Sequence, residues 1–367
     1  MQSLFAYHQS QEAAHLLSQD YIEEVFSPDL NSMEVQDKKE LGRKKKEALK
    51  VFTKAFESGQ PAKHEDADIE KAVHSALDLY KKTEKKDLDF FGKNLVKEVE
   101  KIYAHYLSVL NLGLALTDAA AADKKINHAN LLKNAWIAAL RNSEELSKET
   151  LRLHAGWDKK ADQVKLWLRD VVKQDGEYMD YLDRRSPSMD DQKRIINHLY
   201  RKIILGKTII NDYYEEEVLR WAEDRDIVKG MVEKTIKSYS PETGGAITLY
   251  SLSLNWEDDL HFIEKLYKGS ATLPEEFRQL IADNTRNWEV ERLPLTDRVI
   301  LEMAITEMMS FPGIPVKVTI NEYIELAKGY STPKSRQFIN GILDVIAKEL
   351  KTRGVLKKSG RGLMDNK

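Results

Sequence analysis

The chain of 367 residues contains no cysteine. This absence excludes disulfides, thiolate metal sites and cysteine nucleophiles. The sequence also has no apolar run near the roughly 20 residues that a membrane-spanning helix needs. Its first residues, MQSLFAYHQSQEAAHLL, lack the basic and then apolar pattern of a secretion signal. We therefore expect a cytoplasmic protein that makes no membrane contact.

Neither sign of charge is in large excess. The chain has 57 Lys and Arg residues and 60 Asp and Glu residues, which gives a net charge of -3 at pH 7. A nucleic-acid surface would therefore have to be a local patch. The most basic run is KKELGRKKKEALK at residues 38–50. Such a run is typical of a solvated helix face, and a phosphate-binding role stays open beside that interpretation.

Glycine and proline are scarce, at 17 and 9 residues, and the stretches between them repeat apolar residues at helical spacing. The pattern predicts an all-α protein, with long helical segments at residues 87–116 and 190–224. Breaks are expected near Ser27 and Pro28 and at three polar stretches. These stretches are residues 57–66, 184–191 and 240–247, and the second of them is the best candidate for an internal boundary.

Motifs for catalysis or cofactor binding are missing from the sequence. It has no GxxxxGK[ST], no GxGxxG and no HExxH. The pair Asp258 and His261 is a single DxxH, which we interpret as structural because a di-metal bundle needs ligands from several helices. Six tryptophans, including Trp288, are interpreted as packing residues. We expect no catalytic residues, no metal and no cofactor.

Two local signals mark helices near the C-terminus. Thr319 and Glu322, in TINE, predict a capping box at a helix start. Thr332 and Pro333 predict another start, with the threonine as N-cap and the proline at the first helical position. On the helix before them, Glu307 lies within an apolar stripe, so we expect a partly buried carboxylate that finds a hydrogen-bonding partner and acts as a structural tie.

The helix that starts at Pro333 has an unusual flank. Its core stripe contains Ile339, Ile342, Leu343, Ile346 and Leu350, and Phe338 falls on the shoulder of that stripe, roughly 100° away. Lys334 and Gly341 share this flank, beside a helix N-terminus that favours anions. A base could stack on Phe338 while its phosphate meets Lys334. Alternatively, Phe338 packs under a neighbouring helix and Gly341 permits a close helix crossing.

The C-terminal stretch from Leu295 to Lys351 resembles the NusB family of transcription antitermination proteins. Three ordered motifs carry the resemblance: DRVILEMAITEM at residues 297–308, the proline loop with INEYIELAK at residues 312–328, and FINGILD at residues 338–344. Residues 2–7, QSLFAY, are similar to the family's first-helix pattern, and the match continues more weakly through residues 247–269. The resemblance covers roughly the last hundred residues and the first eight.

The resemblance implies a NusB-like helical bundle elaborated by a large helical extension or insertion. On this basis we expect five segments along the chain. They are residues 1–8 as the first helix of the core, 9–185 as the extension, 186–250 as a helical connection, 251–352 as the C-terminal core and 353–367 as a basic flexible tail.

The resemblance also implies function without catalysis. Family members bind single-stranded boxA RNA of ribosomal RNA leaders together with the small-subunit ribosomal protein NusE, in a complex with other Nus factors and RNA polymerase. Carried over by motif, the RNA-binding residues are Phe338, Lys334, Arg336 and Gln337, and the residues facing the protein partner are Phe5 and Asp297. The structural residues of the motifs are Glu307, Asn321, Glu322, Asn340 and Gly341, the last two of which would hold their helix close to a neighbour.

Several departures from the family shape these expectations. Members usually carry an arginine-rich segment just before the first-helix motif, and this chain begins within the motif, so we expect weaker RNA binding with a flatter salt dependence. Thr285 stands where some members place an aromatic RNA contact. One alternative function is a helical scaffold on polymerase or ribosome with weakened RNA binding. Another is the accessory domain of a ribosomal-RNA methyltransferase, which the missing cysteine disfavours.

Overall fold

The computed structural model describes residues 1–29, 31, 35–285 and 293–366. These residues form helices and connecting loops, and no strand occurs among them. The all-α class predicted from the sequence is therefore confirmed. The chain divides into two compact units, unit 1 with residues 1–96 and 257–367 and unit 2 with residues 97–256. The long helix α3 (Ala67–Ala122) begins in unit 1 and continues in unit 2.

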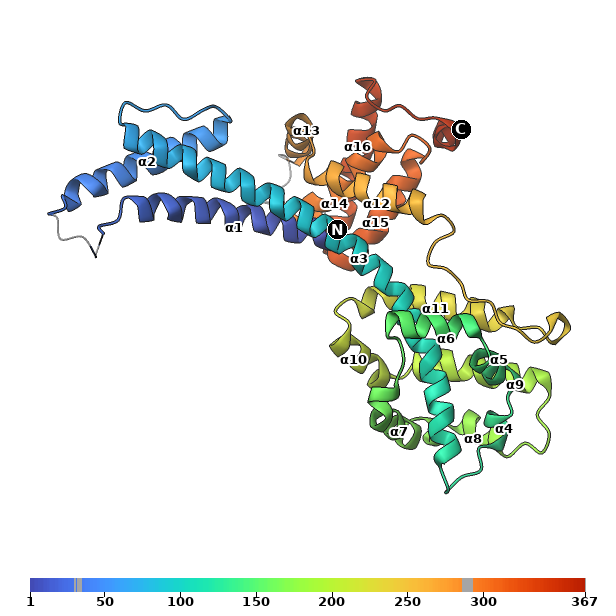
Figure 1. Ribbon diagram of the computed structural model, residues 1–367. Helices are drawn as coiled ribbons and strands as arrows, with labels where there is room; N and C mark the ends of the chain where they lie inside the picture. The colour runs from blue at the N-terminus through green and yellow to red at the C-terminus, as the bar shows by residue number, and fades with distance from the viewer. Residues whose placement is uncertain (30, 32–34, 286–292, 367) are drawn as a thin grey trace. The chain divides into compact units, whose positions relative to one another are not determined.

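Unit 1 combines the two ends of the chain, drawn in blue and in orange to red in Figure 1. Besides the start of α3, its elements are α1 (Gln2–Val25), α2 (Lys38–Ser58), α12 (Trp256–Ala271), α13 (Glu275–Thr285), α14 (Leu295–Ser310), α15 (Val316–Tyr330), α16 (Pro333–Thr352) and the 3-10 helix η5 (Gly360–Asn366).

The first three helices of unit 1 share a small core of their own. Phe52 of α2 is fully buried there between residues of α1 and α3. Local signals fix the helix ends, because Asp37 caps α2 by accepting hydrogen bonds from two backbone N–H groups, and Gly59 ends it in the left-handed conformation at φ 66°. The lysine-rich helix α2 thus forms because it buries one narrow apolar stripe and exposes the rest.

Helix α14 is the centre of the second core in unit 1. Every residue from Val299 to Met308 is buried, and α14 contacts α1, α13, α15 and α16. A helix that is apolar nearly all round is stable only when neighbours surround it. Leu4 and Tyr7 of α1 join this core, so the first helical turns of the chain pack beside segments that lie almost 300 residues later.

The C-terminal tail packs against unit 1, which corrects the prediction of a flexible tail at residues 353–367. The N–H of Ser359 donates a hydrogen bond of 3.0 Å to the carbonyl of Pro312. Val355 and Leu356 pack against the core around α14. Gly362 approaches so closely that a Cβ there would lie 2.0 Å from the Pro312 carbonyl oxygen. Apolar residues and a glycine at the contact point therefore dock a segment that composition alone described as basic and glycine-containing.

Unit 2 contains the remaining helices. Besides the end of α3, they are α4 (Ala129–Leu132), α5 (Ala135–Arg141), α6 (Glu144–Leu153), η1 (Asp158–Lys160), α7 (Ala161–Asp170), η2 (Val172–Gln174), α8 (Gly176–Leu182), α9 (Met189–His198), the π-helix η3 (Leu199–Ile204), α10 (Thr208–Glu217), α11 (Trp221–Ser238) and η4 (Pro241–Thr243).

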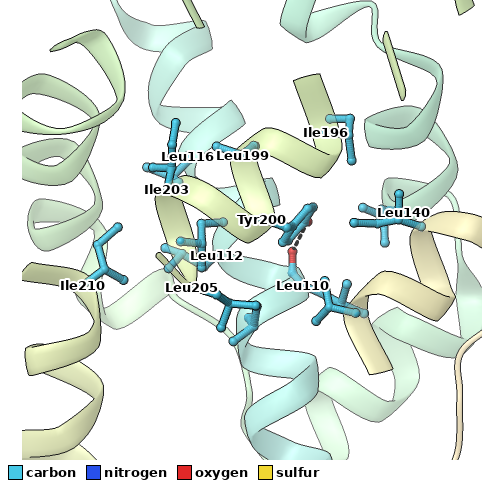
Figure 2. Close-up of a cluster of buried hydrophobic side chains, with 14 of the residues drawn as sticks. Leu110, Leu112, Leu116, Leu140, Ile196, Leu199, Tyr200, Ile203, Leu205 and Ile210 are labelled. Atoms are coloured by element: carbon cyan, nitrogen blue, oxygen red, sulfur yellow. Dashed lines mark hydrogen bonds between the residues drawn. The ribbon is translucent and has the colours of Figure 1, made fainter. Parts of the chain in front are cut away.

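The core of unit 2 packs around α3 and the π-helix (Figure 2). The hydroxyl of Tyr200 donates a hydrogen bond of 2.8 Å to the backbone carbonyl of Leu110 on α3. A Cβ at position 113 would lie 2.1 Å from that hydroxyl oxygen, so only glycine fits there. Four of the six tryptophans are buried in this core, as the sequence predicted, while Trp288 lies outside the described residues.

The predicted breaks coincide with the ends of helices, whereas three predicted segment boundaries do not coincide with structural ones. α1 ends at Val25, and the stretches at 57–66, 184–191 and 240–247 contain loops. The boundary after residue 8 falls inside α1, and the boundaries after residues 185 and 250 fall inside unit 2. Among the helices that the structure describes, none combines the length and apolar character that crossing a bilayer requires.

Candidate nucleic-acid and protein interface

The N-terminal end of α16 forms as the sequence predicted. Thr332 is the N-cap, and its hydroxyl accepts a hydrogen bond of 3.1 Å from the backbone N–H of Ser335, with Pro333 at the first helical position. Lys334 and Gln337 are exposed and Arg336 is half-buried. Two cationic side chains thus stand beside backbone N–H groups at the positive end of a helix dipole, an arrangement that attracts phosphate.

Phe338 is buried rather than displaced onto an open shoulder. Its side chain is 6% exposed and belongs to the core around α14. The helical projection failed here because α16 contacts α13, α14 and α15, so its buried face is wider than one stripe. A base cannot reach the ring without a rearrangement, and this burial favours the packing interpretation of Phe338.

Asn340 and Gly341 do not bring α16 close to a neighbour. Both are exposed, and a Cβ added to Gly341 would have no heavy atom within 4 Å. The expected close helix crossing is therefore wrong for this glycine. It lies on the solvent side of α16, one residue before the buried Ile342.

The short turn between α15 and α16 is fastened from two directions. The hydroxyl of Ser331 donates a hydrogen bond to Oδ1 of Asp297 in the first turn of α14. The side-chain amide of Gln2 donates a hydrogen bond of 3.2 Å to the hydroxyl of Tyr330. Because Ser331 directly precedes the N-cap of α16, these contacts fix where the N-terminal end of α16 lies.

The two residues expected to face a protein partner differ in exposure. Asp297 is 1% exposed, so its carboxylate acts inside the protein, on Ser331. Phe5 is half-buried, between the buried Leu4 and Tyr7 of α1. Of the two, Phe5 alone has side-chain surface that another protein can contact directly.

Glu307 is the structural tie that the sequence predicted. Its carboxylate is 6% exposed and accepts hydrogen bonds of 2.8 Å from the hydroxyl of Thr319 and 3.0 Å from the hydroxyl of Tyr323. Burial and the neighbouring Glu307 raise the pKa of Tyr323 far above its ordinary value, so the phenol stays protonated as a donor. The three side chains join α14 to α15.

The predicted capping box at Thr319 is wrong. α15 begins at Val316 after Pro315, three residues earlier, and Thr319 is fully buried with its hydroxyl directed at Glu307. A threonine that satisfies a buried carboxylate is not available to cap a helix. Asn321 and Glu322 are exposed on α15, so their side chains do not contribute to this buried contact.

Unit 1 contains a buried histidine–glutamate pair that the sequence did not predict. Nε2 of His8 lies 2.8 Å from Oε2 of Glu302, with side chains 6% and 1% exposed. Nε of Arg278 and Nε of Arg298 lie 3.9 and 4.0 Å from Oε1 of the same carboxylate. A cavity of about 630 Å³ lined by α1, α13 and α14 opens beside them. The sequence of α14 carried one signal for this pair. A helix that is apolar nearly all round is surrounded by neighbours, so its few carboxylates are buried and need partners.

Three of the seven basic side chains at residues 38–50, those of Arg43, Lys44 and Lys45, form ion pairs. Arg43 pairs with Glu40 and Glu47 on its own helix, and Lys44 lies 3.0 Å from Asp66 and 2.7 Å from Asp68 at the start of α3. These contacts tie α2 to α3 and favour the interpretation as a solvated helix face. Among the described residues, no group of three or more His, Asp or Glu side chains is arranged to hold a metal ion.

Comparison with known proteins finds similarity in the C-terminal part of this chain. Residues 227–348 match the family model described as "NusB family". The transcription antitermination protein NusB of Salinibacter ruber is 43% identical over 103 residues, which are 28% of this chain and 64% of the relative. That of Chloroherpeton thalassium is 45% identical over 104 residues, 28% of this chain and 49% of the relative.

A third relative, the transcription antitermination protein NusB of Koribacter versatilis, is 42% identical over 94 residues, 26% of this chain and 64% of the relative. The chain thus spans about half to just under two thirds of the length of these relatives, and it is itself longer than they are. No solved structure matches the chain.

Proposed function

We propose that this protein is an RNA-binding transcription factor that works, like the proteins named transcription antitermination protein NusB, by positioning other molecules and without bond chemistry. The observation that carries the proposal is the identity of 42–45% to these relatives over about a hundred residues. The family match at residues 227–348 includes the N-terminal end of α16, where Lys334 is exposed and Arg336 is half-buried.

The proposed RNA is single-stranded and of the boxA type. Lys334 and Arg336 neutralise phosphates beside the positive end of α16, and the exposed Gln337 hydrogen-bonds sugar or base edges. Phe338, buried as it is, holds this end of α16 in place from below. Contacts of this kind make affinity depend on salt, because each neutralised phosphate releases condensed counterions.

The proposed protein partner is the small-subunit ribosomal protein NusE, in a larger assembly with other Nus factors and RNA polymerase. Phe5 offers the half-exposed aromatic contact on α1. Asp297 acts indirectly, since its carboxylate fixes the turn that starts α16. Occupation of the α1 surface and RNA binding at α16 are therefore linked through the contacts of Gln2 and Asp297 with Tyr330 and Ser331.

The test of RNA binding measures fluorescence anisotropy of a labelled boxA RNA against the full chain at several salt concentrations. Lys334→Glu with Arg336→Glu is expected to weaken binding about tenfold or more. The slope of log affinity against log salt should fall by about 1.4, for two lost contacts on a single strand. Lys133→Glu, on an exposed lysine of unit 2, is the control and should leave both quantities unchanged.

The test of the partner repeats the titration with the ribosomal protein present. The partner should increase the RNA affinity of the natural chain, and Phe5→Ala should reduce that increase while leaving RNA binding in its absence intact. An RNA affinity that the ribosomal protein does not change would contradict the heterodimer. An affinity that does not respond to the charge reversal on α16 would contradict the RNA site.

A second candidate function is a helical scaffold that docks on polymerase or ribosome. The burial of Phe338 favours it, because the N-terminal end of α16 then lacks an exposed aromatic side chain for stacking on a base. On this alternative, RNA binds weakly and without preference for boxA over a scrambled sequence, and the charge reversal on α16 leaves assembly with polymerase unchanged.

A further inference from the structure

A lysine-rimmed groove lies at the opposite end of α16 from the proposed RNA contacts. It has a volume of about 640 Å³ and lies between the start of α15, the second half of α16 and the docked tail. We call it the lysine groove, and its lining residues are Val316, Lys317, Ile320, Asp344, Ala347, Lys348, Lys351, Leu356, Lys357, Lys358, Gly362 and Leu363.

The tail builds one wall of the lysine groove through specific contacts. Gly362 sits against the Pro312 carbonyl at a distance that excludes any side chain, and the ammonium group of Lys358 donates a hydrogen bond of 3.2 Å to the Phe311 carbonyl. The N–H of Ser359 adds a third contact to this loop. The wall therefore has a defined position and does not result from a loose chain end.

The floor and the rim of the lysine groove differ in chemistry. Ile320, Ala347, Leu356 and Leu363 provide aliphatic surface, and Leu363 is 53% exposed. The rim carries the five lysines named above against the single carboxylate of Asp344. Lys317, Lys348, Lys351 and Lys357 are exposed. This local excess of positive charge contrasts with the net charge of -3 of the whole chain.

We propose that the lysine groove binds an acidic peptide segment of a partner protein, one that inserts leucine- or isoleucine-type side chains and meets the rim with Asp or Glu. Charge complementarity selects carboxylates, and the aliphatic floor selects branched apolar side chains. RNA fits less well, because the described lining residues include no aromatic ring on which a base could stack.

The lysine groove is independent of the proposed RNA site. Lys334 and Lys348 are fourteen residues apart on α16, which corresponds to about 21 Å along the helix axis. A peptide in the groove and RNA at the N-terminal end of α16 therefore occupy different surfaces. Variants of one surface therefore serve as controls for the other. A negative result for peptide binding would leave the RNA proposal standing, and a negative result for RNA binding would leave the peptide proposal standing.

The first experiment selects peptides from a random display library on the full chain, in parallel with the variant Lys348→Glu/Lys351→Glu. Both lysines are exposed, so the variant should fold normally, which circular dichroism checks. The expected result is a set of peptides rich in Asp, Glu and Leu or Ile that is enriched on the natural chain and absent from the variant. Lys133→Glu should yield the same peptides as the natural chain.

The second experiment titrates one selected peptide, labelled with a fluorophore. The double charge reversal should weaken its affinity about tenfold, because two exposed ion pairs are replaced by repulsion. Leu363→Asp should also weaken it, since the side chain forms part of the floor. Lys334→Glu/Arg336→Glu should have no effect on the peptide. Replacing the acidic residues of the peptide by Gln and Asn should weaken binding to a similar extent.

Three outcomes would overturn the proposal. The first is that no peptide is enriched on the natural chain over the double variant. The second is that the enriched peptides are not acidic. The third is that the double variant loses affinity for RNA to the same degree as the α16 variant does, which would make the lysine groove part of a nucleic-acid surface.

Discussion

The hydroxyl of Ser331 donates a hydrogen bond to the carboxylate of Asp297, which is 1% exposed. Asp297 lies in the first turn of α14, and Ser331 is the residue directly before the N-cap of α16. The contact therefore joins the central helix of unit 1 to the point where α16 begins. Its consequence is that a buried acidic residue determines the position of the exposed Lys334 and the half-buried Arg336.

Asp297→Ala is expected to lower the free energy of unfolding by about 1–3 kcal/mol, because the half-buried Ser331 hydroxyl loses its acceptor. Ser331→Ala should cost at least as much, because it leaves the buried carboxylate of Asp297 without this donor. The double variant should cost less than the two single changes added together. Urea unfolding of all three variants measures the coupling, which should exceed about 0.5 kcal/mol for side chains in contact. Additive effects would mean that the contact does not form in solution.

Phe338→Ala should destabilise unit 1 by about 3–5 kcal/mol, the range for removing a buried aromatic side chain. Phe338→Leu should cost less than about 1.5 kcal/mol because it keeps most of the apolar volume. Thermal unfolding measures both. If the ring packs and does not stack on RNA, the leucine variant keeps its boxA affinity, whereas a large loss of affinity in a stable leucine variant would restore a direct role for the ring.

Gly341→Ala should raise the free energy of unfolding by about 0.5–1 kcal/mol. The residue lies inside α16 with open space around it, so alanine gains helix propensity without a clash. Gly113→Ala is the matched contrast, because its Cβ would meet the Tyr200 hydroxyl in the core of unit 2, and it should be strongly destabilising. A destabilised Gly341→Ala would indicate a close approach at α16 that the structure does not show.

Asp224 makes the stability of unit 2 depend on pH. Its side chain is nearly buried, and burial raises the pKa of the carboxyl group above its ordinary value. Between the unfolded pKa, about 3.9, and the raised folded pKa, the folded state holds the proton more tightly. This contribution to stability is therefore fully present below the unfolded pKa and is lost as pH rises through the folded pKa.

Asp224→Asn should remove this contribution to the pH dependence. Compared with the natural chain, the variant should gain more stability at neutral pH than at acidic pH. Nδ1 of His105 lies 3.9 Å from the carboxylate, and burial lowers the pKa of this histidine, so it is neutral at pH 7 and does not compensate the charge. Urea unfolding from pH 4 to 7, followed by tryptophan fluorescence, measures the difference. Asp226→Asn, at an exposed position, is the control and should follow the natural chain.

Structural features that depend on only a few neighbouring residues were predicted correctly from the sequence. The breaks at 57–66 and 184–191 and the Thr332 cap depend only on local turn chemistry and on hydrogen bonds to nearby N–H groups. The apolar stripe around Glu307 also predicted a buried carboxylate, but not its partners Thr319 and Tyr323. Thr319 fits the capping pattern equally well, but its hydroxyl donates a hydrogen bond to Glu307 on α14 instead.

Residues that depend on distant partners could not be assigned in this way. Phe338 is buried because three helices surround α16, and Gly341 is exposed because none of them reaches that side. His8 and Glu302 form a pair across 294 positions of sequence. Periodicity describes one helix at a time, so it cannot tell how many neighbours that helix has.

The sequence by itself determined the helical class, the main breaks between helices, the N-cap of α16 and the resemblance of the C-terminal region to NusB, because each of these is encoded in residues close together along the chain. The tertiary structure decided which side chains of α16 face solvent, where Asp297 directs its carboxylate and how the tail forms the wall of a groove. Burial and buried hydrogen bonds are properties of neighbours in space, and only the folded chain brings those neighbours together.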